Sequence, residues 1–100
     1  IERGITMEKL RFIGSKTFDA GIEKEFIVYY YIQMNENSET YGVRLEKKYL
    51  DEDKEFEYAE EKGITKSFVF AEELANFLID YEVTPISLPE SLGAFFNEKE

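Results

Sequence analysis

The sequence contains no cysteine, no histidine and no tryptophan, and only two prolines among its 100 residues. The absence of cysteine excludes a disulfide framework and thiol chemistry, and it is typical of proteins from a reducing cytoplasm. Without histidine, the commonest general base and the commonest zinc ligand are missing. No apolar run approaches the roughly 20 residues that a membrane span requires. We therefore expect a cytoplasmic protein that contacts no membrane.

Recognisable catalytic motifs are missing as well. The chain has no P-loop, no dinucleotide-binding fingerprint, no nucleophile elbow and no Cys/His metal spacing. Carboxylate-bound magnesium is the one remaining route to catalysis. We therefore expect a protein that is not an enzyme and that uses no cofactor.

The sequence does contain enough apolar material for one folded domain. Hydrophobic residues make up 43% of the chain and aromatic residues 16%, which argues against disorder despite 34% charged residues. One hundred residues correspond to a single domain. Residues 1–6 precede Met7 and read as an expression-vector remnant, so we assign the domain to residues 7–100.

The net charge of −10 arises entirely in the second half of the chain. Residues 1–50 carry eight acids and eight bases, whereas residues 51–100 carry fourteen acids and four bases. Such a field repels nucleic acid and anionic membranes and attracts basic protein surfaces. A solvated acidic face that keeps the protein soluble explains the same imbalance without any partner.

The segment Glu25–Met34 predicts the central strand of a sheet. It is rich in aromatic and β-branched residues and contains neither Gly nor Pro. Alternation places Phe26 and Tyr30 on one face and Tyr29 and Tyr31 on the other. A strand that is apolar on both faces is typical of the middle of a sheet.

Three further strands are expected around this one. Lys9–Phe18 precedes it, with Gly14 marking a bulge or a close backbone approach. A third strand begins at Thr40 after a polar turn, and a fourth spans Glu55–Glu60.

The hydrophobic period changes at Gly63, after which two helices are expected. Ser67 is a suitable N-cap, the first helix ends before Pro85, and Pro89 suits the first turn of the second helix. The apolar stripe of the first helix comprises Phe70, Leu74, Phe77, Leu78 and Tyr81. The apolar face of the second comprises Leu88, Leu92, Phe95 and Phe96. The sequence therefore predicts an α+β fold, in which an antiparallel meander of about four strands precedes two C-terminal helices packed on one face.

The acidic segment around residues 51–61 is the one cluster of chemically active groups. It does not fit a calcium loop, because the sixth position is Phe56 and the twelfth is Lys62. A two-metal nuclease site would have acids enough but no histidine and no second cluster. A charged turn followed by a charge-protected edge strand explains the segment without a ligand.

The seven tyrosines are the second feature. Because only one sheet face carries both helices, either a loop covers Tyr29 and Tyr31 or they form an exposed aromatic patch suited to an interface. Basic residues are too few for nucleic-acid stacking.

Two short motifs carry a family resemblance. They are Tyr41-Gly42-Val43 at the start of a strand, and Val83-Thr84-Pro85-Ile86 followed by Leu88 before the last helix. On these motifs, residues 26–96 resemble a family of small uncharacterised proteins of Gram-positive bacteria and their mobile elements. Where that family usually has a His-Leu-like step, this chain has Ser87-Leu88.

The size, the acidity and the lack of catalytic groups also resemble the anti-CRISPR inhibitors of type II effector nucleases. That resemblance implies a stoichiometric inhibitor in a bacterial host cell, whose carboxylates occupy arginine-rich surfaces used for guide RNA or target DNA.

Our leading hypothesis is therefore a small acidic inhibitor that binds a basic nucleic-acid-binding surface of a protein partner and contacts no nucleic acid itself. The alternatives are a bacterial regulatory or adaptor protein that docks a host protein through its sheet, and a carboxylate–magnesium ribonuclease. The expected partner-binding residues are acids and two tyrosine anchors of the same segment: Asp51, Asp53, Glu55, Glu57, Glu60, Glu61, Tyr49 and Tyr58. We expect no catalytic residues and no metal ligands.

Overall fold

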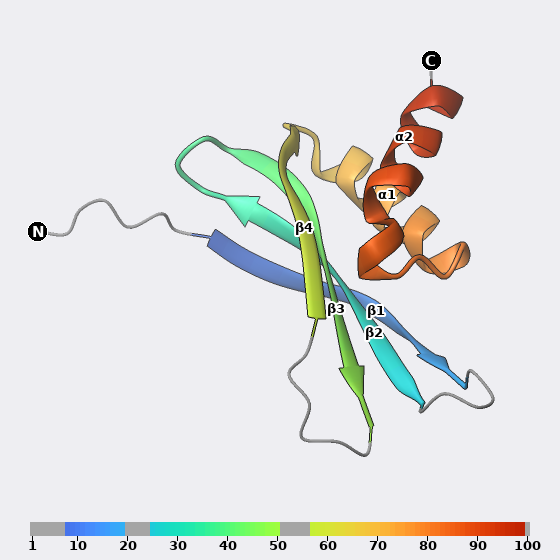
Figure 1. The fold of residues 1–100 in the computed structure, drawn as a ribbon. Helices are drawn as coiled ribbons and strands as arrows, with labels where there is room; N and C mark the ends of the chain where they lie inside the picture. Colours follow the sequence, from blue (N-terminus) through green and yellow to red (C-terminus); the bar gives the residue numbers. More distant parts are fainter. Residues whose placement is uncertain (1–7, 20–24, 51–56, 100) are drawn as a thin grey trace, which may run out of the picture.

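The computed structural model describes residues 8–19, 25–50 and 57–99 of the chain. Its elements are β1 (Glu8–Phe18), β2 (Phe26–Asn35), β3 (Thr40–Tyr49), β4 (Glu57–Thr65), α1 (Phe68–Asp80), the short 3-10 helix η1 (Pro85–Ser87) and α2 (Leu88–Lys99). The four strands form one antiparallel sheet in the order β1-β2-β3-β4, with the helices on one side (Figure 1). The predicted α+β meander with two C-terminal helices is confirmed.

The central strand β2 has the predicted alternation. As predicted, β2 is an interior strand, paired with β1 on one side and with β3 on the other. Phe26, Val28, Tyr30 and Ile32 are buried on the face that the helices cover. The residues between them point to the opposite face of the sheet.

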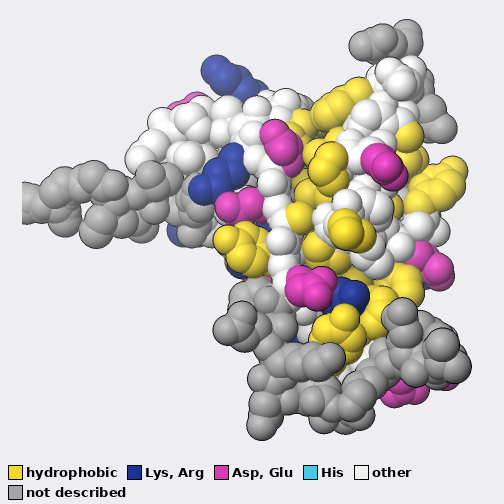
Figure 2. Space-filling model, in the orientation of Figure 1, with side chains coloured by type: hydrophobic (Ala, Val, Ile, Leu, Met, Phe, Trp, Pro, Cys, Tyr) yellow, Lys and Arg dark blue, Asp and Glu magenta, His cyan; other side chains and the backbone are white. Residues whose placement is uncertain are grey.

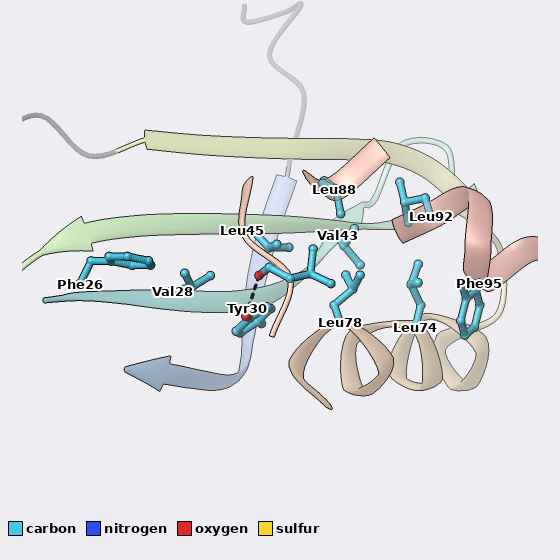
Figure 3. Packing of buried hydrophobic residues seen from close by; sticks show 11 residues of the cluster. Phe26, Val28, Tyr30, Val43, Leu45, Leu74, Leu78, Leu88, Leu92 and Phe95 are labelled. Carbon is cyan, nitrogen blue, oxygen red and sulfur yellow. Dashed lines mark hydrogen bonds between the residues drawn. The ribbon is translucent and has the colours of Figure 1, made fainter. Parts of the chain in front are cut away.

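The hydrophobic core lies between the sheet and the helices (Figure 3). Its fully buried side chains come from β2, β3, α1 and α2, among them Val28, Tyr30, Val43, Leu45, Leu74, Leu78 and Leu88. The predicted apolar face of α2 is confirmed, since Leu88, Leu92 and Phe95 are buried and Phe96 packs against the core.

One polar group is built into this core. The Tyr30 hydroxyl donates a hydrogen bond of 2.7 Å to the Val83 carbonyl oxygen, in the turn between α1 and η1 (Figure 3). A buried hydroxyl needs such a partner. The bond therefore fixes the helical turn to the central strand.

Two glycines of the sheet are explained by close approach of other atoms. The predicted irregularity at Gly14 is confirmed: the β1–β2 register shifts between Phe12 and Gly14, and a Cβ on Gly14 would lie 3.0 Å from Ile79 Cδ1. The constraint on Gly42 is tighter, because its Cβ would lie 2.0 Å from the Glu61 carbonyl oxygen. At that point the β3–β4 register also shifts.

The fourth strand is longer than the alternation predicted. The prediction ended it at Glu60, but β4 continues to Thr65. Gly63 has a φ of +64°, which lets the backbone bend so that pairing resumes at Tyr41 and Thr65. The first part of the predicted strand, residues 55 and 56, lies outside the described residues.

The first helix begins after Ser67 and ends before Pro85, as predicted; its last residue is Asp80. Ser67 Oγ accepts a hydrogen bond of 3.1 Å from the Phe70 amide, so its role as N-cap is confirmed. The assignment of Tyr81 to the apolar stripe is wrong, because Tyr81 is the C-cap and is 67% exposed. Its backbone leaves helical geometry there, with its ring beside that of Phe77.

None of the helices in the described ranges is both long enough and apolar enough to cross a membrane.

Candidate binding surface

The sheet face opposite the helices carries the candidate site, and we call it the open face. No described element packs on it. Its central side chains come from all four strands: Leu10, Phe12, Tyr29, Tyr31, Gln33, Arg44, Glu46, Tyr58 and Glu60.

The β1 and β2 part of the open face is aromatic. The Phe12 ring centroid lies 5.8 Å from that of Tyr31 and 6.3 Å from that of Tyr29. Phe12 is nevertheless 54% exposed, and the neighbouring Leu10 is 46% exposed. No described loop covers Tyr29 and Tyr31. Of the two alternatives, the described residues therefore favour an exposed aromatic patch.

The β3 and β4 part of the open face is an ion-pair cluster around Arg44. Arg44 Nε donates to Glu46 Oε2 at 2.8 Å, and Nη1 donates to Glu60 Oε1 at 2.9 Å. Gln33 Nε2 donates to the same Glu60 oxygen at 3.1 Å. The Arg44 guanidinium also lies 4.0 Å from the centroid of the Tyr58 ring, so this side chain is held by both charge and aromatic contact.

The protonation of Glu60 reflects these contacts. Burial acts to raise the pKa of its carboxyl, but hydrogen bonds from Gln33 and Arg44, together with the positive charges of Lys62 and Arg44, lower it below its usual value of 4.5. Burial raises the pKa of the Tyr31 hydroxyl, with the nearby charge of Glu46 adding to the effect. Glu60 therefore stays ionised and Tyr31 neutral at physiological pH.

The structure distributes the predicted site residues over two faces. Tyr58 and Glu60 lie together on the open face, and Tyr58 is 54% exposed. Tyr49 packs against the core on the helical side. The other two described acids also lie on that side: Glu57 is 3.9 Å from Lys47, and Glu61 borders a hollow beside α2.

The remaining predicted residues, Asp51, Asp53 and Glu55, lie outside the described residues. In the described ranges, no three acidic side chains come close enough together to hold a metal ion.

Sequence reasoning missed Phe12, Leu10 and Arg44. Alternation along each strand puts Leu10 and Phe12 on one face of β1 and Arg44 on the outward face of β3. Only the strand register shows that these two faces are the same side of the sheet, with Tyr29 and Tyr31 between them.

The segment that forms the helical layer contains acids but no bases of its own. Residues 67–97 contain no Lys or Arg, whereas they contain five acids, namely Glu72, Glu73, Asp80, Glu82 and Glu90. Figure 2 shows acidic and hydrophobic side chains intermingled over the helices. The described β4 acids Glu57 and Glu60 lie close to bases of the same chain, and Glu82 of the helical layer lies 3.9 Å from Lys16.

The fold and the open face together define a small α+β domain in which the described helices cover one side of the sheet. The chain belongs to the family described as "Family of unknown function (DUF6514)", which matches residues 9–98. This agrees with the expected membership in a family of small uncharacterised proteins. No curated protein matches the chain, and no solved structure matches it.

Proposed function

We propose that this protein is a non-catalytic binding protein that docks a protein partner through its open face. The supporting observation is the exposure of Phe12 and Leu10 beside the tyrosines of β2. Aromatic residues and arginine are enriched in protein interfaces, where rigid rings supply contact area at low entropic cost.

The chemistry of the open face indicates what kind of partner fits. One half is aromatic and carries no ionised group at its centre, so it suits an apolar patch on the partner. In the other half, Arg44 is paired with the carboxylates of Glu46 and Glu60, and Lys62 lies 3.9 Å from Glu60. Two bases therefore balance two acids, so this half suits a polar area of the partner rather than a strongly charged one.

A pair of matched variants tests this proposal. Phe12→Ser removes the most exposed ring of the patch, and Val69→Ser removes an equally apolar side chain that is 63% exposed on α1. Immobilised wild-type protein and Val69→Ser should retain the same partner from extracts of the native cells, and Phe12→Ser should not. Equal retention by Phe12→Ser, with its thermal unfolding unchanged, would contradict the proposal.

A second candidate function is inhibition of a nucleic-acid enzyme by covering its basic surface, with the type II CRISPR effector nuclease as the proposed partner. The five acids of residues 67–97, a segment without Lys or Arg, and the net charge of −10 support it, because acidic surfaces compete with phosphates for arginine-rich channels. Such a protein would block either guide RNA loading or engagement of target DNA.

This second proposal is tested by capture of the nuclease with and without bound guide RNA. Charge reversal of Glu72 and Glu73 should weaken capture in low salt. Charge reversal of Glu57 and Glu61 examines the acidic segment and leaves the Arg44 cluster intact. If neither pair changes capture, the electrostatic mechanism is wrong.

A further inference from the structure

A concave site lies on the helical side of the sheet, beside the start of α1, and shares Leu10 at the sheet edge with the open face used in the proposed function. Its lining comes from β1, β2, β3 and α1: Lys9, Leu10, Arg11, Ile32, Met34, Tyr41 and Phe68. Its volume of about 400 Å³ falls within the range typical of small-molecule sites.

The floor of this pocket is apolar and partly aromatic. The rings of Tyr41 and Phe68 meet edge to face, with centroids 5.5 Å apart. Ile32 is fully buried beneath them. Met34 adds a flexible, polarisable side chain that adapts to the shape of a guest ring. The floor therefore suits a flat apolar or aromatic body.

The rim of the pocket is basic, in a chain that is otherwise strongly acidic. Arg11 lies with its guanidinium carbon 5.2 Å from the Phe68 ring centroid. No described acidic side chain forms an ion pair with Arg11, whereas Lys9 is paired with Glu36 at 2.9 Å. Phe68 is the first residue of α1, so the positive end of that helix dipole lies beside the same pocket.

We propose that this pocket binds a small aromatic carboxylate. The aromatic ring of the ligand lies against Tyr41 and Met34, and its carboxylate is held by the Arg11 guanidinium. Arginine matches a carboxylate with two parallel hydrogen bonds, which fixes the orientation of the ligand as well as attracting its charge.

The test uses phenylacetate and its neutral analogue phenylacetamide, which differ in charge but hardly in shape. Each is titrated into the full-length protein while NMR follows the Arg11 Nε–H and Met34 methyl signals. Phenylacetate should give saturable shifts at both groups, with an affinity in the millimolar range that suits a ligand this small. Phenylacetamide should bind at least tenfold more weakly.

Two variants distinguish recognition of the ligand carboxylate by Arg11 from nonspecific attraction of the ligand to any basic side chain. Arg11→Gln should weaken phenylacetate binding at least tenfold and leave phenylacetamide binding within twofold. Lys16→Gln removes a base from the same strand outside the pocket and should change neither. Equal affinities for the acid and the amide, unchanged binding in Arg11→Gln, shifts centred elsewhere or no saturable shifts would each overturn the proposal.

Discussion

Gly42 shows most directly how a single residue determines the shape of this sheet. The β4 backbone crosses so close to it that an added Cβ would lie 2.0 Å from the Glu61 carbonyl oxygen and 2.8 Å from Lys62 Cα. Both are backbone atoms, which cannot move aside as a flexible side chain can. The glycine of the Tyr41-Gly42-Val43 motif is therefore explained by strand packing.

We predict opposite effects for alanine at two glycines. Gly42→Ala should lower the free energy of unfolding by about 2 kcal/mol or more, because the bulged strand must be displaced. Gly93→Ala should raise it by up to about 1 kcal/mol, since Gly93 is a helical position with open space around it. Urea unfolding of both variants checks this, and equal effects would contradict the packing argument.

Tyr30 connects the central strand to the turn after α1. Replacing it with phenylalanine removes the hydrogen bond to the Val83 carbonyl and should cost about 1 kcal/mol at neutral pH. Burial, and secondarily the charge of Glu82, raises the pKa of the Tyr30 hydroxyl above its usual value of 10. The unfolded chain therefore ionises first, and the stabilisation is lost as pH rises above 10.

Unfolding of wild type and Tyr30→Phe at several pH values tests this prediction. The difference in stability between them should be constant up to about pH 10 and should narrow at higher pH. If the difference stays constant through the alkaline range, ionisation of the Tyr30 hydroxyl does not cause the loss of stability at high pH.

Glu60 should have the opposite pH dependence. Its pKa is lowered in the folded protein, so its contribution is present above pH 4.5 and is lost as pH falls further. Glu60→Gln should cost about 1 kcal/mol at pH 7, because Arg44 loses a charged acceptor. The cost should shrink when unfolding is measured below pH 4.5. Glu61→Gln, an exposed neighbour, serves as the control and should have little effect at either pH.

At the scale of elements, most of the fold could be predicted because each segment follows one hydrophobic period. Alternation identified β2 and β3, and the helical spacing identified α1, with its N-cap Ser67, and α2. The errors occurred where one residue changed the geometry. The positive φ of Gly63 extended β4 beyond Glu60, and the end of α1 at Asp80 left Tyr81 in solvent.

The start of α1 provides a test at this scale. Ser67 Oγ accepts a hydrogen bond from the Phe70 amide, which otherwise has no partner within the helix. Ser67→Ala should therefore lower the free energy of unfolding by about 1 kcal/mol, measured by thermal or urea unfolding. Ser67→Asp should retain most of the stability, since aspartate is also a good N-cap. A similar loss in both variants would count against a capping role.

At the scale of the whole molecule, the helices occupy one sheet face and leave the other to a mixed aromatic and ionic surface. That arrangement could not be read from sequence, because it depends on register. Tyr49 and Tyr58 flank one predicted turn, yet they lie on opposite faces. Arg44 and Glu60 are sixteen positions apart and meet only through the β3–β4 pairing.

The central claim is that the open face around Phe12 contacts a protein partner. Its most direct test is a photo-crosslinking side chain placed at position 12 in the native cells, with the same group at Ile86 as control. Ile86 is 90% exposed on the helical side. We predict one discrete crosslinked species from position 12 that position 86 does not give. The same products from both positions, or none from position 12, would contradict the claim.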